Sequence, residues 1–342
     1  MRLRHHVGII VAFAMALCEA ASQDVILTNA MYSGNQLLLE WTPPTNRFVI
    51  EQATTLTDQF QIVASSSNTV ANSIHVGTNL AATGFFRLRH GLEVVVIQDT
   101  NFLAGLVAAV PFKHEPTNYL FDIDLAGITN LFEDHGGITN ISGIEYCSSL
   151  AHLDLFENDI RDVGPMSNLT SILTIELGYN HTTNLSPLAG LTNLFYLGIT
   201  QNGITDISFV SGLISLRELY AAYNPIADLG PLGALTNLEV LALANCVTTN
   251  LAPVGSLTQL REIYILESSF SDISSLAALT NLYRAHLSGN EITDLQALVD
   301  NAAAGGLGSG DQLELNDNPL NDYAITNQIP ILRDVYGIDV SI

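Results

Sequence analysis

Carboxylate and aromatic side chains recur between residues 150 and 290 in columns separated by 22 residues or multiples of 22. Tyrosine and phenylalanine bury a large area at a small cost in conformational entropy, and carboxylates add directional hydrogen bonds. This combination is typical of a surface that recognises a partner. We therefore predict ligand binding by the following residues: Asp154, Phe156, Glu176, Tyr179, Tyr196, Glu218, Tyr220, Tyr223, Glu262, Tyr264 and His286.

One pair among these residues allows an enzymatic interpretation. Asp154 and Glu176 lie one 22-residue step apart, which would place their carboxylates on neighbouring strands about 4.8 Å apart. Two carboxylates at such a distance could hydrolyse a glycosidic bond. Stacked carboxylates are common on acidic repeat arrays, however, and the sequence contains no serine-hydrolase, zinc-protease or phosphate-loop motif. We expect a protein that is not an enzyme, with no catalytic residue and no cofactor.

A separate column of Asp and Asn residues could either bind calcium or cap turns. Each repeat supplies one such side chain, whereas calcium requires six to eight oxygen ligands. Capping of the following turn is the better explanation, and we predict no metal site. The column consists of Asp162, Asn184, Asp206, Asp228, Asn250, Asp272 and Asp294.

The apolar residues around these candidates define a repeat of 22 residues that runs from Leu150 to Asn301 without insertion or deletion. In the first copy Leu150, Leu153 and Leu155 are followed by Asn158, giving the pattern L-x-x-L-x-L-x-x-N. Its local alternation predicts a short strand in each copy, paired in parallel with the next copy. Alternate residues then share one exposed face of the sheet. Prolines beyond the strand, such as Pro165, favour short turns or 3₁₀ helices on the opposite wall.

This pattern resembles the leucine-rich repeat. The segment GGITNISGIEYCSSL resembles the entry to bacterial internalin-like arrays, and LELNDNPLND with IPILRDVYGIDVSI resembles the end cap of such proteins. The resemblance implies an α/β solenoid: a right-handed leucine-rich repeat with a parallel concave sheet and an outer wall of short 3₁₀ helices and turns. We predict repeats over 128–311 and a C-terminal cap over 312–342. The candidate residues then lie on the concave face or its rim.

Residues 24–91 have a different texture, with five or six short β-rich runs separated by turn residues. They predict a small all-β sandwich, and the run LLLEWTPPTNRFVIEQATTLTD resembles a fibronectin-III-like domain. Residues 92–127 then form a linker and the N-terminal cap of the array.

The first residues predict export. Arg2 and Arg4 precede an apolar run at 7–17 that is too short to cross a bilayer, which indicates a signal peptide over 1–21. No later stretch reaches 18 apolar residues, so we predict no membrane span in the mature form. The protein would be secreted, periplasmic or attached to the cell surface.

The charge balance limits the possible partners. The chain has 34 acidic and 11 basic side chains, a formal net charge of −23, and this excludes nucleic acid as a partner. We predict an exported, monomeric recognition protein that binds a protein or glycan on the concave face. The alternative is a structural or adhesive cell-surface component in which the β domain is the docking module.

Overall fold

A computed structural model of the chain describes residues 26–33, 36–42, 48–53, 61–66, 73–76, 85–90, 94–110 and 120–342. The chain divides into two compact units. One comprises residues 1–96 with 110–127, and the other residues 97–109 with 128–342. The predicted signal peptide lies outside the described residues.

The described strands of the first unit form antiparallel sheets. In one sheet β2 lies between β1 and β5, and in another β3 lies between β4 and β6. This agrees with the predicted all-β class, and the fibronectin-III-like resemblance stays a prediction. The bounds are β1 Ile26–Ser33, β2 Gln36–Thr42, β3 Phe48–Ala53, β4 Gln61–Ser66, β5 Ser73–Val76, β6 Phe85–His90, β7 Val94–Val95, β8 Leu120–Phe121 and, for the helix that follows β8, α3 Asp122–Ala126.

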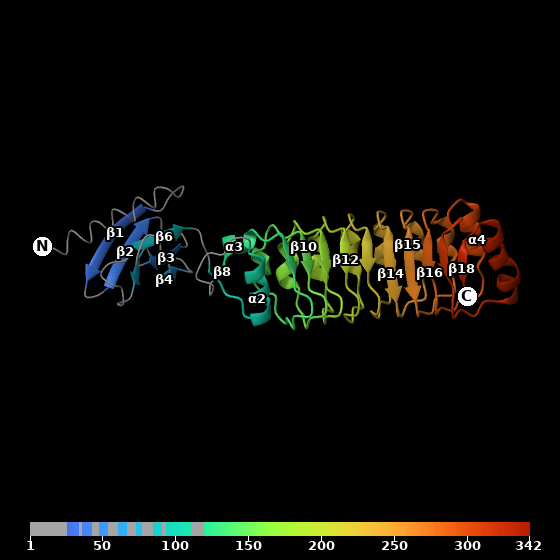
Figure 1. The fold of residues 1–342 in the computed structure, drawn as a ribbon, viewed down its shortest axis with the longest axis horizontal. Coiled ribbons are helices and arrows are strands. Elements are labelled where there is room, and N and C mark those ends of the chain that lie inside the picture. Colours follow the sequence, from blue (N-terminus) through green and yellow to red (C-terminus); the bar gives the residue numbers. More distant parts are fainter. Residues whose placement is uncertain are drawn as a thin grey trace. The chain divides into compact units, whose positions relative to one another are not determined.

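The second unit is the predicted solenoid, with one short strand from each coil in a parallel ten-stranded sheet. Neighbouring strands between residues 130 and 286 pair residues 22 apart, as His152 pairs with Thr174, so in this part the sequence period is the sheet register. The last two pairings are offset by 28 and 27 residues. The strands follow one another in chain order along the array (Figure 1). The central residue of a strand, such as Leu153, is buried in the core, while the residues on either side are half-buried on the opposite surface. We call that surface the sheet face. Its strands are β9 Asn130–Phe132, β10 His152–Asp154, β11 Thr174–Glu176, β12 Tyr196–Gly198, β13 Glu218–Tyr220, β14 Val240–Ala244, β15 Glu262–Leu266, β16 Arg284–His286, β17 Gln312–Glu314 and β18 Asp339–Ser341.

Short 3₁₀ helices form the outer wall, as predicted. Each of η2 to η7 begins just after a residue of the Asp and Asn column, whose side chain accepts a hydrogen bond from the backbone two residues on. Gly164 N donates to Asp162 Oδ1 at 2.8 Å, for example, so this column caps turns. The helices are η1 Ile144–Tyr146, η2 Gly164–Asn168, η3 Ser186–Gly190, η4 Ser208–Gly212, η5 Gly230–Ala234, η6 Ala252–Ser256 and η7 Ser274–Ala278.

Buried asparagines tie successive coils together immediately after the strands. Asn180 Nδ2 donates to Leu155 O of the preceding coil at 2.8 Å and to Leu177 O of its own coil at 3.1 Å. Its Oδ1 accepts a bond from Ile160 N at 3.0 Å. We call this series the asparagine ladder, and its members are Asn158, Asn180, Asn202, Asn224, Asn290 and Asn318.

The ladder is interrupted where Cys246 and Ser268 occupy the asparagine position. Cys246 N donates a hydrogen bond to Ser268 Oγ at 3.3 Å. Ile226 N donates to Asn224 O of its own coil instead of to an amide of the next coil. A thiol or hydroxyl cannot make the several simultaneous bonds of an amide. Two adjacent coils therefore lack the asparagine amide bridge found on either side, although the bond from Cys246 N to Ser268 Oγ still joins them.

Both ends of the solenoid are covered. Helix α2, Thr100–Ala109, buries Phe102 and Leu106 completely at the N-terminal end. Asp99 caps this helix and also accepts a 2.8 Å bond from Thr139 N in the first coil. The C-terminal end comprises α4 Gln296–Ala303, the π-helical segments η8 Ala324–Gln328 and η9 Ile331–Val335, and β18. Within the described part of the chain, no helix is long and apolar enough to cross a membrane.

Candidate functional site

The predicted binding residues lie on the sheet face or on the turn that follows a strand, and none of them is buried. Tyr179 and Tyr223 occupy the turn, where both adopt the left-handed conformation with φ of 57° and 56°. Their rings remain 40% and 43% exposed. The eleven side chains do not converge on one point, because the solenoid distributes them along its length. Ten of them fall into three clusters, and Tyr223 lies outside these clusters on its turn.

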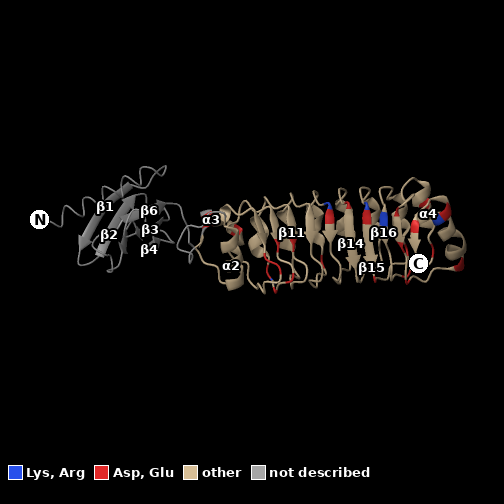
Figure 2. Cartoon of the chain, in the orientation of Figure 1, with Lys and Arg blue, Asp and Glu red and all other residues tan. Residues whose placement is uncertain are grey.

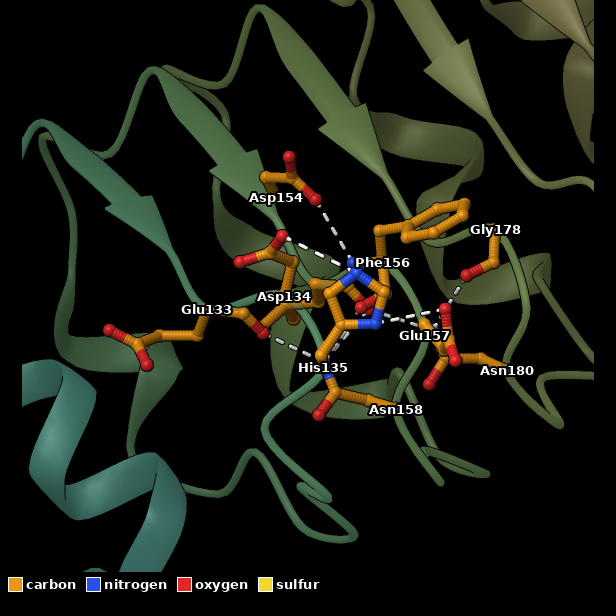
Figure 3. Close-up of polar contacts among 10 residues, drawn as sticks. Glu133, Asp134, His135, Asp154, Phe156, Glu157, Asn158, Gly178 and Asn180 are labelled. Atoms are coloured by element: carbon orange, nitrogen blue, oxygen red, sulfur yellow. Dashed lines mark hydrogen bonds and ion pairs between the residues drawn. The ribbon is translucent and has the colours of Figure 1, made fainter.

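The N-terminal cluster occupies the first coils and consists of Phe132, Asp134, His135, Asp154, Phe156, Glu157 and Tyr179. The ring of Phe156 makes edge-to-face contacts with His135 at 5.7 Å and with Tyr179 at 5.1 Å. His135 Nδ1 lies 2.9 Å from Glu157 Oε2, and His135 Nε2 lies 3.7 Å from Asp134 Oδ2 (Figure 3). The cluster thus combines aromatic rings with carboxylates around a single imidazole.

An open pocket of about 410 Å³ adjoins this cluster on the turn side. Its lining includes Glu157, Asp159, Tyr179, His181 and Gln201. His181 Nδ1 lies 3.7 Å from Asp159 Oδ1, and both side chains are more than half exposed. The pocket therefore offers two carboxylates and the ring of Tyr179 to solvent.

The central cluster consists of Glu176, Tyr196, Glu218 and Tyr220. Tyr196 OH donates to Glu176 Oε2 at 2.7 Å, and Tyr220 OH lies 3.3 Å from Glu218 Oε2. The two tyrosine rings contact each other at 5.5 Å. The carboxylate of Glu176 lies over Gly198, where an added Cβ would collide with it, so the glycine makes this arrangement possible.

Both central tyrosines resist ionisation. Burial, followed by the hydrogen bond and negative charge of Glu176, raises the pKa of Tyr196 well above its usual range. Burial and the charge of Glu218 raise the pKa of Tyr220 to about 12. Both phenols stay protonated at neutral pH and act as hydrogen-bond donors.

The C-terminal cluster consists of Glu262, Tyr264, Tyr283, Arg284 and His286, and its charges are paired. Glu262 accepts hydrogen bonds from the hydroxyls of Tyr264 and Tyr283. Arg284 Nη1 lies 3.1 Å from Glu262 Oε2 and 3.3 Å from Tyr264 OH. Burial alone would raise the pKa of Glu262, but the tyrosine hydrogen bonds and the charge of Arg284 outweigh it, and the pKa is lowered.

Two arginines at the starts of β15 and β16 extend this pairing. Arg261 and Arg284 both lie over the ring of Tyr283, each 5.6 Å from its centroid. Glu239 contacts Arg217, and its Oε2 lies 3.9 Å from Arg261 Nη1. Basic segments accordingly lie beside acidic ones around β14 to β16 (Figure 2).

Asp154 and Glu176, the pair considered for glycosidase chemistry, accept hydrogen bonds from the backbone. Asp154 Oδ1 accepts a bond from Phe156 N at 3.0 Å, and Glu176 Oε1 accepts one from Gly178 N at 2.7 Å. Each carboxylate thus caps its own strand end. Among the described residues, no group of three or more His, Cys, Asp or Glu side chains could hold a metal ion.

Sequence reasoning missed part of the N-terminal cluster. Phe132, Asp134 and His135 belong to a degraded first copy of the repeat, whose apolar columns are incomplete. The available signal was the period itself: Phe132 lies 22 residues before Asp154, and its strand pairs with β10 in that register. Phe132 is 63% exposed on the sheet face.

Comparison with known proteins agrees with this architecture. A family model described as Leucine Rich repeats (2 copies) matches residues 214–254. No curated protein matches the chain. An internalin C2 from Listeria monocytogenes has 36% sequence identity and a TM-score of 0.56, over 58% of this chain and 88% of that chain.

Two further solved structures share the fold. An internalin (inlF) from Listeria monocytogenes is 28% identical with a TM-score of 0.63, over 72% of this chain and 68% of that chain. The plant peptide hormone receptor RGFR1, solved in complex with RGF2, is 20% identical with a TM-score of 0.50, over 59% of this chain and 33% of that chain. The ten parallel strands with 3₁₀ turns and the identity to internalin C2 over most of its length show that the chain belongs to the internalin-like leucine-rich repeat proteins.

Proposed function

We propose that this chain is an exported recognition protein whose sheet face binds a protein partner. The observation that carries the proposal is the exposure of Phe132 on the sheet face and of Tyr179 and Tyr223 on the adjoining turns, at 63%, 40% and 43%. Exposed aromatic residues surrounded by polar groups are typical of interface centres. The repeat fold requires apolar residues only at its inward positions, so it does not explain these rings.

The scaffold under the face also favours binding. The asparagine ladder and the strand pairing fix the spacing of successive coils, so little conformational entropy would be lost when a partner docks. The receptor RGFR1, which shares this fold, was solved in complex with RGF2. Export rests on the N-terminal sequence pattern and the family relationship.

Position-specific cross-linking tests this proposal. The photoreactive amino acid p-benzoylphenylalanine is placed at Tyr220 on the sheet face or, as a control, at Ile214, which is 59% exposed in the turn that follows η4 of the outer wall. Each full-length protein is illuminated with extracellular proteins from its native environment. We expect a discrete protein adduct from position 220 that unlabelled wild-type protein competes away, and none from position 214.

Three outcomes would contradict the proposal. Equal adducts from both positions would mean unspecific contact, and an adduct from position 214 alone would place binding on the outer wall. A carbohydrate adduct at position 220 would replace the protein partner with a glycan.

A further inference from the structure

We propose that the N-terminal cluster binds a basic polypeptide segment and that an Arg or Lys side chain of this partner enters the pocket beside Tyr179. The inference rests on the proposed function, because it names the partner chemistry for one part of the same sheet face.

The carboxylates of the N-terminal cluster are not balanced by lysine or arginine side chains. Between residues 114 and 216 the only Lys or Arg is Arg161, which lies past the turn rather than on a strand. Asp134 and Glu157 are 62% and 57% exposed, and His135 is the partner that each of them contacts. One imidazole cannot neutralise both carboxylates, so a cationic group would complement this surface.

Aromatic rings lie beside these carboxylates. Phe156 and Tyr179 contact each other at 5.1 Å, and the ring of Tyr179 also borders the pocket. The quadrupole of an aromatic ring attracts a cation placed over its face. A guanidinium can also stack on the ring while its N–H groups donate hydrogen bonds to carboxylates. Glu157 and Asp159 line the same pocket and would accept those hydrogen bonds.

The C-terminal cluster of the same face shows how such a surface holds a guanidinium. There a carboxylate, Glu262, and two tyrosine rings surround the chain's own guanidinium, that of Arg284. The N-terminal cluster presents the corresponding carboxylates and rings but contains no arginine or lysine. The partner would therefore supply the group that Arg284 supplies within the chain.

Binding of two fluorescent peptides to the full-length protein tests the inference. Hexa-arginine is the probe and hexaglutamate the charge-reversed control, and fluorescence anisotropy reports binding. One variant carries Asp134→Asn with Glu157→Gln. A charge-matched control carries Glu291→Gln with Asp322→Asn, which removes two exposed carboxylates outside the cluster. A third variant carries Phe156→Leu with Tyr179→Leu and leaves the net charge unchanged.

We expect hexa-arginine, but not hexaglutamate, to bind the wild type. The Asp134 and Glu157 double variant should weaken binding about tenfold and the aromatic double variant about fivefold. The charge-matched control should change binding less than about twofold, because salt screens distant charges. Thermal unfolding of each variant establishes that it is folded. If the Asp134 and Glu157 variant does not fold, Glu157→Asn alone replaces it, because Asn tolerates the left-handed conformation at this position.

Equal weakening by the cluster and control variants would overturn the inference, since binding would then follow net charge alone. Unchanged binding by the aromatic variant would also overturn it. Cross-linking from Tyr220 separates this failure from failure of the proposed function. If the adduct persists while hexa-arginine shows no preference for the cluster, the sheet face binds a partner of different chemistry.

Discussion

The N-terminal and C-terminal clusters are made of similar residues on one sheet, yet their carboxylates have different partners. In the C-terminal cluster Glu262 is held by two tyrosine hydroxyls and Arg284. In the N-terminal cluster Asp134 and Glu157 share one histidine and remain mostly exposed. The comparison shows that a periodic scaffold can present an internally satisfied surface and an open one a few coils apart.

The asparagine ladder beneath the two clusters also differs: it is continuous near the open cluster and interrupted near the paired one. The asparagine ladder is continuous from Asn158 to Asn224 under the open surface. It is interrupted at Cys246 and Ser268, next to the paired surface. The ladder resumes at Asn290 and Asn318, and beside the interruption the side chains of Arg284 and Glu262 link neighbouring strands on the sheet face.

The largest expected effect is on stability, from removal of one ladder amide. Asn202→Ala would deprive the buried Thr182 N and Thr182 Oγ1 of their acceptor, Asn202 Oδ1, and would remove the amide bond from Asn202 Nδ2 to Leu177 O of the preceding coil. We expect a loss of about 3 kcal/mol in the free energy of unfolding, measured by urea denaturation. Ser268→Ala at the interruption is the matched control and should cost less than about 1 kcal/mol. Equal losses would show that the ladder does not carry the difference.

The next effect concerns the paired carboxylate. Glu262→Gln removes the charge that Arg284 and two tyrosines satisfy, and we expect a loss of about 2 kcal/mol. Glu157→Gln on the open surface should change stability by less than about 0.5 kcal/mol. Since the pKa of Glu262 is lowered in the folded state, its contribution should be present at neutral pH and lost as the pH falls through that folded value. A wild-type acid-unfolding profile identical to that of Glu262→Gln would contradict this assignment.

A gain of stability should follow when the ladder is completed. Cys246→Asn places an amide where its neighbours have one, next to Ile226 N of the preceding coil. We expect a gain of about 1 kcal/mol, visible as a higher denaturation midpoint. Destabilisation by this substitution would mean that the coil spacing at β14 and β15 has adapted to the smaller residue.

The smallest effect appears only at alkaline pH. Burial and the charge of Glu218 raise the folded pKa of Tyr220 to about 12, above the usual tyrosine pKa of about 10. The unfolded chain therefore releases this proton first, and stability is lost as the pH rises from about 10 through 12. Ultraviolet absorbance titration of Tyr220→Phe should lack a tyrosinate component near 12, and an unchanged curve would disprove the assignment.

The 22-residue period was sufficient to predict the solenoid, because each apolar column has only one way to face the core. It also predicted that the binding candidates share a surface. It could not predict how they cluster, since that depends on local details such as the space that Gly198 leaves for Glu176. Phe132 was missed because its repeat copy has degraded columns, and the contacts of Tyr283 depend on rotamers that a sequence pattern does not specify.

The most direct test of sheet-face binding is the affinity of the cross-linked partner for two double variants. Tyr179→Ala with Tyr220→Ala removes rings from the sheet face, whereas Ile214→Ala with Val335→Ala removes exposed apolar side chains elsewhere. We predict at least a tenfold weaker interaction for the first variant and less than about twofold weakening for the second. Unchanged affinity of the tyrosine variant, with its fold intact, would contradict recognition through the sheet face.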